Sequence, residues 1–304
     1  IGLPVRGFNR AQPWKNVSVL IDLARSIRQV KAIIRDFQPN VGVGVGGYAS
    51  GAAMWAAADM GIPILLQEQN GFAGVTNKIL KDKAAKICVA YEGMERFFPA
   101  DKIILTGNPV RQNLTEGRKS KDGSRKTLLI IGGSLGARTI NEAVKAALPQ
   151  LAKSDIHVVW QTGKVYYESC KAAWEVAGQP ANIECLDFLS DMPDRYANAD
   201  LVISRAGASS ISELCLLGKP AILVPSPNVA EDHQTHNAMA LVNKDAAVLV
   251  RDAEAAEKLI PTALELIQNE AKLKTLHTNV LKLAQTDSAK RIAEEVIKLA
   301  KKQK

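Results

Sequence analysis

The chain has 304 residues, of which 47% are hydrophobic and 23% charged, with a formal net charge of +8. This composition excludes a disordered, collagen-like or low-complexity protein, and the length suggests about two domains. The best candidate for a membrane-spanning segment, 49–66, contains Asp59, Gly61 and Pro63, so we predict no transmembrane helix. The four cysteines form no C-x-x-C pair, which predicts reduced thiols in a cytosolic protein.

Short apolar runs alternate with helical patterns along the whole chain. Strands are expected at 41–45, 62–66, 86–90, 102–106, 127–131, 157–161, 183–186, 201–204, 221–224 and 247–250. Helices are expected at 17–37, 51–59, 74–83, 136–151, 164–177, 208–217 and 233–243. Strands that are apolar on both faces, each followed by a helix, predict parallel sheets covered on both sides, the α/β class.

A polar, glycine-punctuated segment divides the chain. We therefore predict a first Rossmann-like domain at 1–114, a linker at 115–126, a second Rossmann-like domain at 127–286 and a C-terminal helix at 287–304. The first domain is the candidate partner of that last helix. Asp287 or Ser288 is expected to cap it, with an apolar stripe of Ala289, Ile292, Ala293, Val296, Ile297 and Ala300.

Charge is unevenly distributed between the two halves. Residues 1–114 carry 14 Lys and Arg against 8 Asp and Glu, whereas residues 127–304 carry 20 against 21. The basic half predicts contact with a polyanion, although ordinary variation in surface charge remains an alternative. Aromatic residues make up only 5%, which argues against nucleic acid as a partner and favours a membrane surface or a phosphorylated acceptor.

Two glycine turns follow expected strands. Residues 132–136 (Gly-Gly-Ser-Leu-Gly) and 46–51 (Gly-Gly-Tyr-Ala-Ser-Gly) each stand between a strand and a helix, but neither matches the dinucleotide or P-loop fingerprint. Such turns expose backbone N–H groups to phosphate, or they simply allow close packing. Because ligands of α/β sheets bind at the carboxyl ends of strands, the pair favours two phosphate-bearing ligands.

A third strand end is rich in small hydroxyl residues. The segment 205–214 begins a helix after the strand 201–204, and Glu213 could accept both hydroxyls of a ribose; ordinary serine capping is the alternative. Polar loops at 67–74 and 106–111 also follow strands, and together they are typical of a site for a polyhydroxylated ligand. His233 and His236 have no third ligand at a suitable spacing, so we predict no metal.

Six motifs in order resemble the MurG family of peptidoglycan glycosyltransferases. They are Gly46-Gly47-Tyr48-x-Ser50-Gly51, Glu68-Gln69-Asn70-Gly71-x-Ala73-Gly74-x-Thr76-Asn77-Lys78, Gly107-Asn108-Pro109-Val110-Arg111, Gly132-Gly133-Ser134-x-Gly136-Ala137, Ser204-Arg205-x-Gly207-Ala208 and Asp232-x-Gln234. That family transfers N-acetylglucosamine from UDP-N-acetylglucosamine to undecaprenyl-diphospho-muramoyl-pentapeptide, converting lipid I to lipid II.

The resemblance implies a GT-B fold, two Rossmann-like domains with an interdomain cleft, and an inverting N-acetylglucosaminyltransferase of peptidoglycan synthesis without metal or cofactor. It implies a peripheral protein on the cytoplasmic face of the bacterial inner membrane, with UDP-GlcNAc, lipid I and the anionic membrane surface as partners. Contacts with other cell-wall synthesis proteins are left open. Near the apolar stretch 17–23, the cations expected to face the membrane are Arg6, Arg10, Lys15, Arg25 and Arg28.

The resemblance also assigns residues. On the donor side it implies Arg111 and Ser134 at the diphosphate, Leu189 beside uracil through its backbone, and Glu213 at the ribose. Gln234 and Asn70 would hold the sugar, and the nucleotide would be wrapped by Ala208, Ser209, Ser210, Ile211 and Ser212. The acceptor side would comprise Gly46, Gly47, Tyr48, Glu68 and Asn77.

The family begins with a strand and a Gly-Gly-Thr-Gly-Gly-His loop whose His is the favoured general base. This sequence begins at Ile1 without that loop, so we expect an N-terminal truncation, predict no catalytic residue within it and leave open whether it is active alone. Gln67 stands where many members carry His. Two alternatives remain, a UDP-GlcNAc 2-epimerase-like enzyme and an inactive UDP-sugar-binding scaffold.

Overall fold

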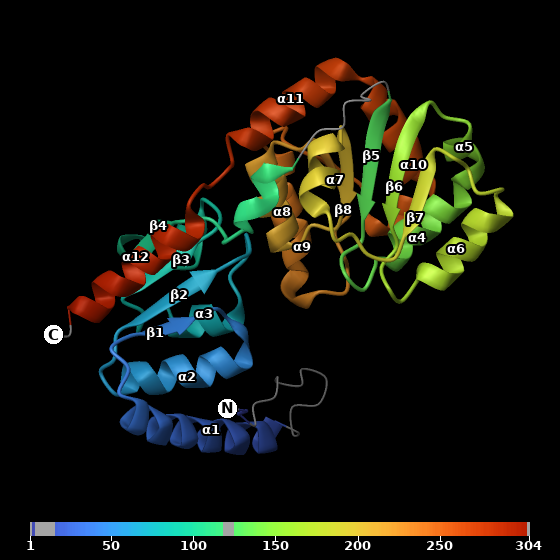
Figure 1. Cartoon of the computed structure of the whole chain (residues 1–304). Helices are drawn as coiled ribbons and strands as arrows, with labels where there is room; N and C mark the ends of the chain where they lie inside the picture. Colours follow the sequence, from blue (N-terminus) through green and yellow to red (C-terminus); the bar gives the residue numbers. More distant parts are fainter. Residues whose placement is uncertain (1, 4–15, 118–124, 303–304) are drawn as a thin grey trace. The chain divides into compact units, whose positions relative to one another are not determined.

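The computed structural model describes residues 2–3, 16–117 and 125–302, and Figure 1 shows its elements. Contacts divide the chain into two compact units, Ile1–Asn108 with Asp287–Lys304, and Pro109–Thr286. This division falls before the predicted linker at 115–126, of which residues 118–124 lie outside the described part. Among the described residues, no helix is both long and apolar enough to cross a membrane.

The first unit is built on a four-stranded sheet of order β1-β2-β3-β4, in which every neighbouring pair is parallel. Its strands are β1 (Gly42–Gly44), β2 (Ile64–Glu68), β3 (Lys86–Val89) and β4 (Ile103–Leu105). Its helices include α1 (Asn16–Phe37), α2 (Gly47–Asp59) and α3 (Val75–Leu80), with 3₁₀ turns η2 (Met94–Arg96) and η3 (Ala100–Lys102). All five residues of β2 are buried, as a strand covered on both faces requires.

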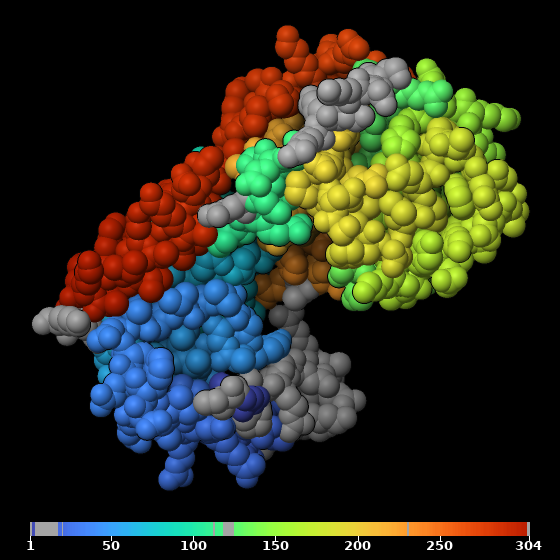
Figure 2. Space-filling view, viewed as in Figure 1, coloured from blue at the N-terminus to red at the C-terminus, as the bar shows by residue number. Residues whose placement is uncertain are grey.

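Helix α12 (Ser288–Lys301) packs on this first sheet, and Figure 2 shows it in red along the surface of the unit. Leu299 is buried against Leu65 and Cys88, and Arg291 Nη2 donates to the Leu105 carbonyl at 2.6 Å. The buried face therefore differs from the predicted stripe.

Ile292 and Val296 pack against that cluster as predicted, but Ala289, Ala293 and Ile297 are exposed. The predicted stripe is wrong in these three positions, because the contact of α12 with the sheet runs through Leu299 instead. Asp287, one of the two predicted caps, occupies the N-cap position at φ 55°, but its side chain makes no capping hydrogen bond.

The second unit has a six-stranded parallel sheet of order β10-β9-β8-β5-β6-β7. Its strands are β5 (Lys126–Ile131), β6 (Ile156–Gln161), β7 (Ile183–Leu186), β8 (Leu201–Ser204), β9 (Ala221–Leu223) and β10 (Val248–Leu249). Each strand expected from the sequence is present in one of the two sheets. The α/β class and the two Rossmann-like units of the GT-B fold are confirmed.

Helices surround this second sheet. They are α4 (Arg138–Ala146), α5 (Leu148–Ala152), α6 (Tyr167–Val176), α7 (Met192–Asn198), α8 (Ala208–Leu217), α9 (His233–Val242), α10 (Ala255–Gln268) and α11 (Glu270–Leu281). Short 3₁₀ turns lie at η4 (Gln112–Glu116), η5 (Ala230–Asp232) and η6 (Asp252–Glu254). The single helix expected over 136–151 is divided in two, and Pro149, which has no N–H, lies in the first turn of α5. Helices α7, α10 and α11 were not predicted.

Candidate functional site

The second sheet has its topological switch point between β5 and β8. β5 pairs with β6 on one side and with β8 on the other, so the order of the strands reverses there. Ligands of open α/β sheets bind outside the carboxyl ends of the strands at such a point. The glycine turn 132–136 follows β5 and the start of α8 follows β8, so both predicted phosphate-binding segments lie at this edge.

Gln161, the last residue of β6, holds the glycine turn in place. Its Oε1 accepts from the Gly132 amide at 3.2 Å, and its Nε2 donates to the carbonyls of Gly133 at 2.9 Å and Asp187 at 3.1 Å. The predicted Ser134 is exposed in this turn. Gln161 was missed by the sequence analysis, and a polar amide directly after the apolar run Val158-Val159-Trp160 is the signal that indicates it.

Helix α8 begins at the same edge without a side-chain cap. Gly207 is its N-cap residue, so the serine cap considered as an alternative is not observed. Backbone N–H groups in the accessible first turn, residues 208–210, are thus available for an anion. Farther along the predicted nucleotide-binding stretch, Ile211 is buried and the Ser212 hydroxyl donates to the Ala208 carbonyl of the same helix at 2.9 Å.

Glu213 lies on α8 between two partners. The Tyr196 hydroxyl donates to its Oε2 at 3.0 Å, and Arg111 Nη2 lies 3.6 Å from its Oε1. The Arg111 side chain is 62% exposed, whereas that of Glu213 is 14% exposed. The structure therefore brings together the cation predicted for the diphosphate and the carboxylate predicted for the ribose.

The loop 187–191 carries the predicted uracil contact. Leu189 is buried in this loop, and its predicted backbone contact with uracil stays a prediction. Arg195 on α7 clamps the end of this loop, because its Nε pairs with Asp191 Oδ2 at 2.9 Å and its Nη1 with Glu184 Oε2 at 2.8 Å.

Gln234 lies in the first turn of α9. Its Oε1 accepts from the Ser226 amide at 2.9 Å, which orients the side-chain amide. The neighbouring His233 and His236 belong to no metal-binding cluster. Within the part of the chain that the structure describes, no group of three or more His, Cys, Asp or Glu could hold a metal ion.

The predicted acceptor-side residues gather at the carboxyl ends of β1 and β2 in the first unit. Gly46 and Gly47 adopt φ values of 85° and 79° at the start of α2, a conformation that side chains disfavour. Thr76 Oγ1 donates to the Gly47 carbonyl at 3.2 Å, which links this turn to α3. Tyr48 in the first turn of α2 is 57% exposed.

Glu68 is the centre of a buried network beneath this surface. Its carboxylate accepts from the amides of Asn70 at 3.1 Å and Gly74 at 3.0 Å, and from Asn77 Nδ2 at 2.8 Å. Both oxygens are therefore used to shape the loop 68–77. Asn70, the donor-side residue predicted outside the second unit, belongs to this network.

Gln67 is buried in a neighbouring network of amides. Its Nε2 donates to Asn108 Oδ1 at 2.9 Å, its Oε1 accepts from Gln69 Nε2, and Asn108 Nδ2 donates to the Gln69 carbonyl at 3.0 Å. These groups satisfy one another and contain no titratable side chain. A general base is consequently not provided at Gln67.

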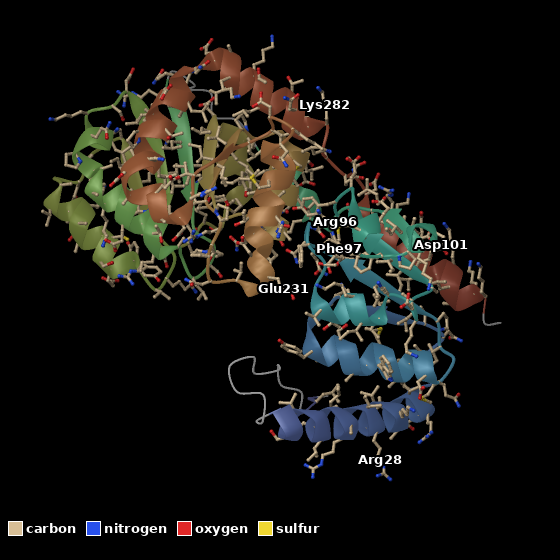
Figure 3. The ribbon with its side chains drawn as sticks, turned by 180° about the vertical axis from the view of Figure 1, so that it is seen from behind. Arg28, Arg96, Phe97, Asp101, Glu231 and Lys282 are labelled. Carbon is tan, nitrogen blue, oxygen red and sulfur yellow. The ribbon has the colours of Figure 1, made fainter. Side chains whose placement is uncertain are left out.

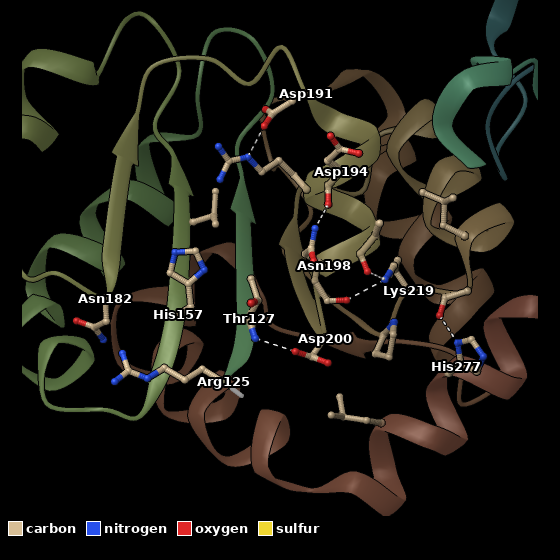
Figure 4. Close-up of a pocket in the computed structure, with 18 of the residues that line it drawn as sticks. Arg125, Thr127, His157, Asn182, Asp191, Asp194, Asn198, Asp200, Lys219 and His277 are labelled. Carbon is tan, nitrogen blue, oxygen red and sulfur yellow. Dashed lines mark hydrogen bonds and ion pairs between the residues drawn. The ribbon is translucent and has the colours of Figure 1, made fainter. Parts of the chain in front are cut away.

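A pocket of about 940 Å³ lies at the opposite, amino-terminal edge of the second sheet (Figure 4). Two of its basic groups contact the ends of helices, and the first is Lys219, whose Nζ donates to the carbonyls of Ala197 and Ala199 at 3.3 and 2.9 Å. His277 Nδ1 lies 2.6 Å from the Gly218 carbonyl and must donate, because a carbonyl oxygen only accepts. These contacts cap helix C-termini, so we assign no ligand to this pocket.

Comparisons with known proteins identify the family of the chain. The model of the glycosyltransferase family 28 C-terminal domain matches residues 127–296, and that of the family 28 N-terminal domain matches residues 1–89. A relative from Bacteroides thetaiotaomicron, 58% identical over 310 residues, covers 99% of this chain and 83% of its own. It is named UDP-N-acetylglucosamine–N-acetylmuramyl-(pentapeptide) pyrophosphoryl-undecaprenol N-acetylglucosamine transferase.

The crystal structure of Acinetobacter baumannii MurG is 29% identical with a TM-score of 0.79, covering 92% of this chain and 79% of that one. The chain belongs to the MurG family. Membership of the MurG family confirms the motif-based expectation and makes the protein a glycosyltransferase.

A UDP-GlcNAc 2-epimerase from Neisseria meningitidis, solved with UDP-GlcNAc, is also similar. It is 16% identical with a TM-score of 0.64 and covers 96% of this chain and 84% of that one. At that identity the likeness shows the fold alone. The comparisons therefore support the MurG transferase and not the epimerase alternative.

Proposed function

We propose that this chain transfers N-acetylglucosamine from UDP-GlcNAc to undecaprenyl-diphospho-MurNAc-pentapeptide, releasing UDP and lipid II. The relative at 58% identity is named for this reaction. The observation that carries the proposal is the pairing of Arg111 with Glu213 beside the uncapped start of α8. One group is suited to a diphosphate and the other to a ribose.

The second unit holds the donor in this proposal. Arg111, Ser134 and the first-turn amides of α8 receive the diphosphate, because cations and helix N-termini stabilise phosphate charge. The loop at Leu189 contacts uracil, and Glu213 accepts the ribose hydroxyls. Gln234 presents its Nε2 to the sugar, since its Oε1 already accepts from the Ser226 amide.

The reaction is a single inverting displacement. The C4 hydroxyl oxygen of the muramoyl sugar bonds to the anomeric carbon while the bond from that carbon to the UDP oxygen breaks, turning an α-linked donor into a β-linked product. Negative charge develops on the departing UDP, where Arg111 and the backbone N–H groups stabilise it. The hydroxyl proton passes to a general base, a role we assign neither to Glu68 nor to Gln67, since both are engaged in buried networks.

UDP release separates this proposal from its alternatives. The protein is incubated with UDP-GlcNAc, with and without a soluble lipid I analogue, and UDP, UDP-N-acetylmannosamine and free N-acetylmannosamine are quantified. Acceptor-dependent UDP release is expected. Formation without acceptor of UDP-N-acetylmannosamine, or of N-acetylmannosamine and UDP by hydrolysis, would instead support the epimerase, and UDP binding without turnover would support the scaffold.

We further propose that the first unit lies peripherally on the anionic cytoplasmic face of the bacterial inner membrane. Arg25 and Arg28 on α1 are exposed, Ile21 on the same helix is 49% exposed, and Figure 3 shows Arg28 pointing away from the fold. Each cation near an anionic surface contributes about 1 kcal/mol. The other basic residues expected at this surface, at positions 6, 10 and 15, lie outside the described residues.

Vesicle co-sedimentation tests the membrane proposal. The paired substitution Arg25→Glu and Arg28→Glu should reduce binding to vesicles containing phosphatidylglycerol, and binding should fall with salt. The matched control reverses two exposed lysines of the second unit, Lys153→Glu and Lys274→Glu. The proposal would be refuted if the α1 variant and the lysine control bound these vesicles equally. It would also be refuted if the unaltered protein bound neutral vesicles as well as it binds vesicles containing phosphatidylglycerol.

A further inference from the structure

Tyr196 is a buried residue with a polar contact to the proposed ribose site. Its side chain is inaccessible to solvent, and its hydroxyl donates to Glu213 Oε2 at 3.0 Å. A buried hydroxyl that contacts a carboxylate makes a charge-assisted hydrogen bond, which is stronger and more directional than a neutral one. Tyr196 therefore restrains the rotation of the Glu213 carboxylate.

The Tyr196 hydroxyl stays protonated, as this role requires. Burial, the charge of Glu213 and the hydrogen bond to it raise the pKa of Tyr196 well above its ordinary value, and Arg111 acts weakly in the opposite direction. The group therefore donates over the whole range of pH in which the protein would operate. Glu213 must be the acceptor of this bond.

The helix that carries Tyr196 is itself tied to neighbouring elements. α7 has only seven residues, and an isolated helix of that length is unstable in water. Arg195 ties it to β7 through Glu184, and Lys219 donates to the carbonyls of Ala197 and Ala199 at its C-terminal end. Tyr196 is thus presented from a fixed platform.

The segment that carries Arg111 packs on the same helix. A Cβ added to Gly117 would lie 2.0 Å from the Pro193 carbonyl oxygen, so the backbone after η4 touches the first turn of α7. Leu114 within η4 is buried. α7 therefore contacts both the chain that positions Arg111 and, through Tyr196, the carboxylate that Arg111 faces.

The geometry leaves Glu213 able to bind a diol. A carboxylate has about four acceptor positions on its two oxygens. Tyr196 uses one position on Oε2, and Oε1 faces Arg111. Acceptor positions remain on both oxygens, and their directions are set by the hydrogen bond from Tyr196.

We infer that Tyr196 is a positioning residue that orients the Glu213 carboxylate toward the ribose hydroxyls of the donor nucleotide. The inference rests on the proposed function, in which Glu213 contacts ribose. Tyr196 acts through Glu213 and does not itself touch the donor. The specificity for a ribonucleotide over a deoxyribonucleotide should consequently depend on Tyr196.

Titration calorimetry with UDP and 2′-deoxy-UDP tests this. The variants are Tyr196→Phe, Glu213→Ala and the double variant, with Tyr167→Phe as the matched control, since Tyr167 lies on α6 away from these residues. Tyr196→Phe should weaken UDP binding about 5- to 20-fold and 2′-deoxy-UDP binding much less. The ratio of UDP affinity to 2′-deoxy-UDP affinity should therefore fall. In the Glu213→Ala background Tyr196→Phe should have no further effect, because the two act as one unit.

The outcomes are distinguishable. If Glu213→Ala leaves the ratio unchanged, the ribose role in the proposed function fails and this inference falls with it. If Glu213→Ala lowers the ratio but Tyr196→Phe weakens both ligands equally, or weakens neither, only the inference is overturned. A Tyr196→Phe effect that adds fully to that of Glu213→Ala would also overturn it, because a general structural role is additive.

Discussion

Gly136 and Gly163 pack back to back, with no room for a side chain between them. A Cβ added to Gly163 would lie 2.1 Å from the Gly136 amide nitrogen, and one added to Gly136 would lie 2.1 Å from the Thr162 carbonyl oxygen. Both glycines have positive φ, 85° and 80°. The turn after β5 can approach the end of β6 only because both positions lack a side chain. This close approach fixes the position of the glycine turn proposed to bind the diphosphate.

Substitution of Gly136 by Ala should therefore damage the donor site. The new methyl group must displace the backbone of Thr162, so the turn 132–136 shifts and UDP binding falls at least 10-fold. Gly178→Ala is the matched control, because Gly178 has the same φ of 85° but open space around it. The control should lose about 1–2 kcal/mol of stability from backbone strain alone. Thermal unfolding and calorimetry measure both effects, and equal UDP affinity for the two variants would contradict the prediction.

Substitutions of Glu213 and Gln234 should affect different parts of the donor, the nucleotide and the sugar respectively. Glu213→Ala removes charge-assisted hydrogen bonds to ribose, worth about 1.5–3 kcal/mol, and should weaken UDP about 10- to 150-fold. Gln234→Ala should leave UDP affinity nearly unchanged and weaken UDP-GlcNAc, since its amide is proposed to contact the sugar. Calorimetry with UDP alone and with UDP-GlcNAc measures the difference. Equal losses of UDP affinity in the two variants would show the assignment to be mistaken.

The two faces of α12 should respond differently to a charge. Val296 packs toward the first sheet, whereas Ile297 is 52% exposed. Val296→Asp places a carboxylate at a partly buried position against apolar side chains and should lower the unfolding temperature by several degrees, but Ile297→Asp should change it little. The sequence-based stripe predicts similar losses for both residues, so thermal unfolding of this pair decides between the two faces.

The cysteine thiols should react much more slowly in the folded protein than in the unfolded chain. Burial raises the pKa of Cys215 to about 12, that of Cys185 to about 12 and that of Cys88 to about 11. The thiolate is the reactive form, so these thiols should react slowly with a disulfide reagent at pH 8, and all four cysteines should react rapidly in denaturant.

The same shifts predict the direction of the pH dependence. An unfolded thiol ionises near pH 8.5, so the unfolded state releases protons first and gains relative stability as pH rises. The stabilising contribution of the buried thiols is thus complete below about pH 8.5 and is lost toward pH 12. Denaturant titrations at pH 7.5 and 10 check this, and an unchanged midpoint would contradict it.

Strand positions were predictable because each strand is a short apolar run bounded by turn residues. Helix α7 was missed, although Asp191 followed by Pro193 is a recognisable start for a helix. Helix α10 was missed as well, despite apolar residues at helical spacing that pack in the core, namely Leu259, Ile260, Ala263, Leu266 and Ile267. In α10 the internal Pro261 argues against a helix, whereas α7, with seven residues, is too short to show a clear periodic pattern.

The motifs predicted the family and assigned residues to the donor, but they do not indicate how those residues are held. Gln161 and Tyr196 carry no motif signal, and each gains its role from partners elsewhere in the chain.

The sequence by itself determined the alternation of strands and helices, the parallel sheets and the membership of a glycosyltransferase family. These follow from local hydrophobic periodicity and from short motifs, which are properties of neighbouring residues. Only the tertiary structure decided that Glu213 contacts both Tyr196 and Arg111, and that Leu299 of α12 packs against the first sheet. Local periodicity shows that a side chain is buried, whereas its partner depends on which distant element packs against it.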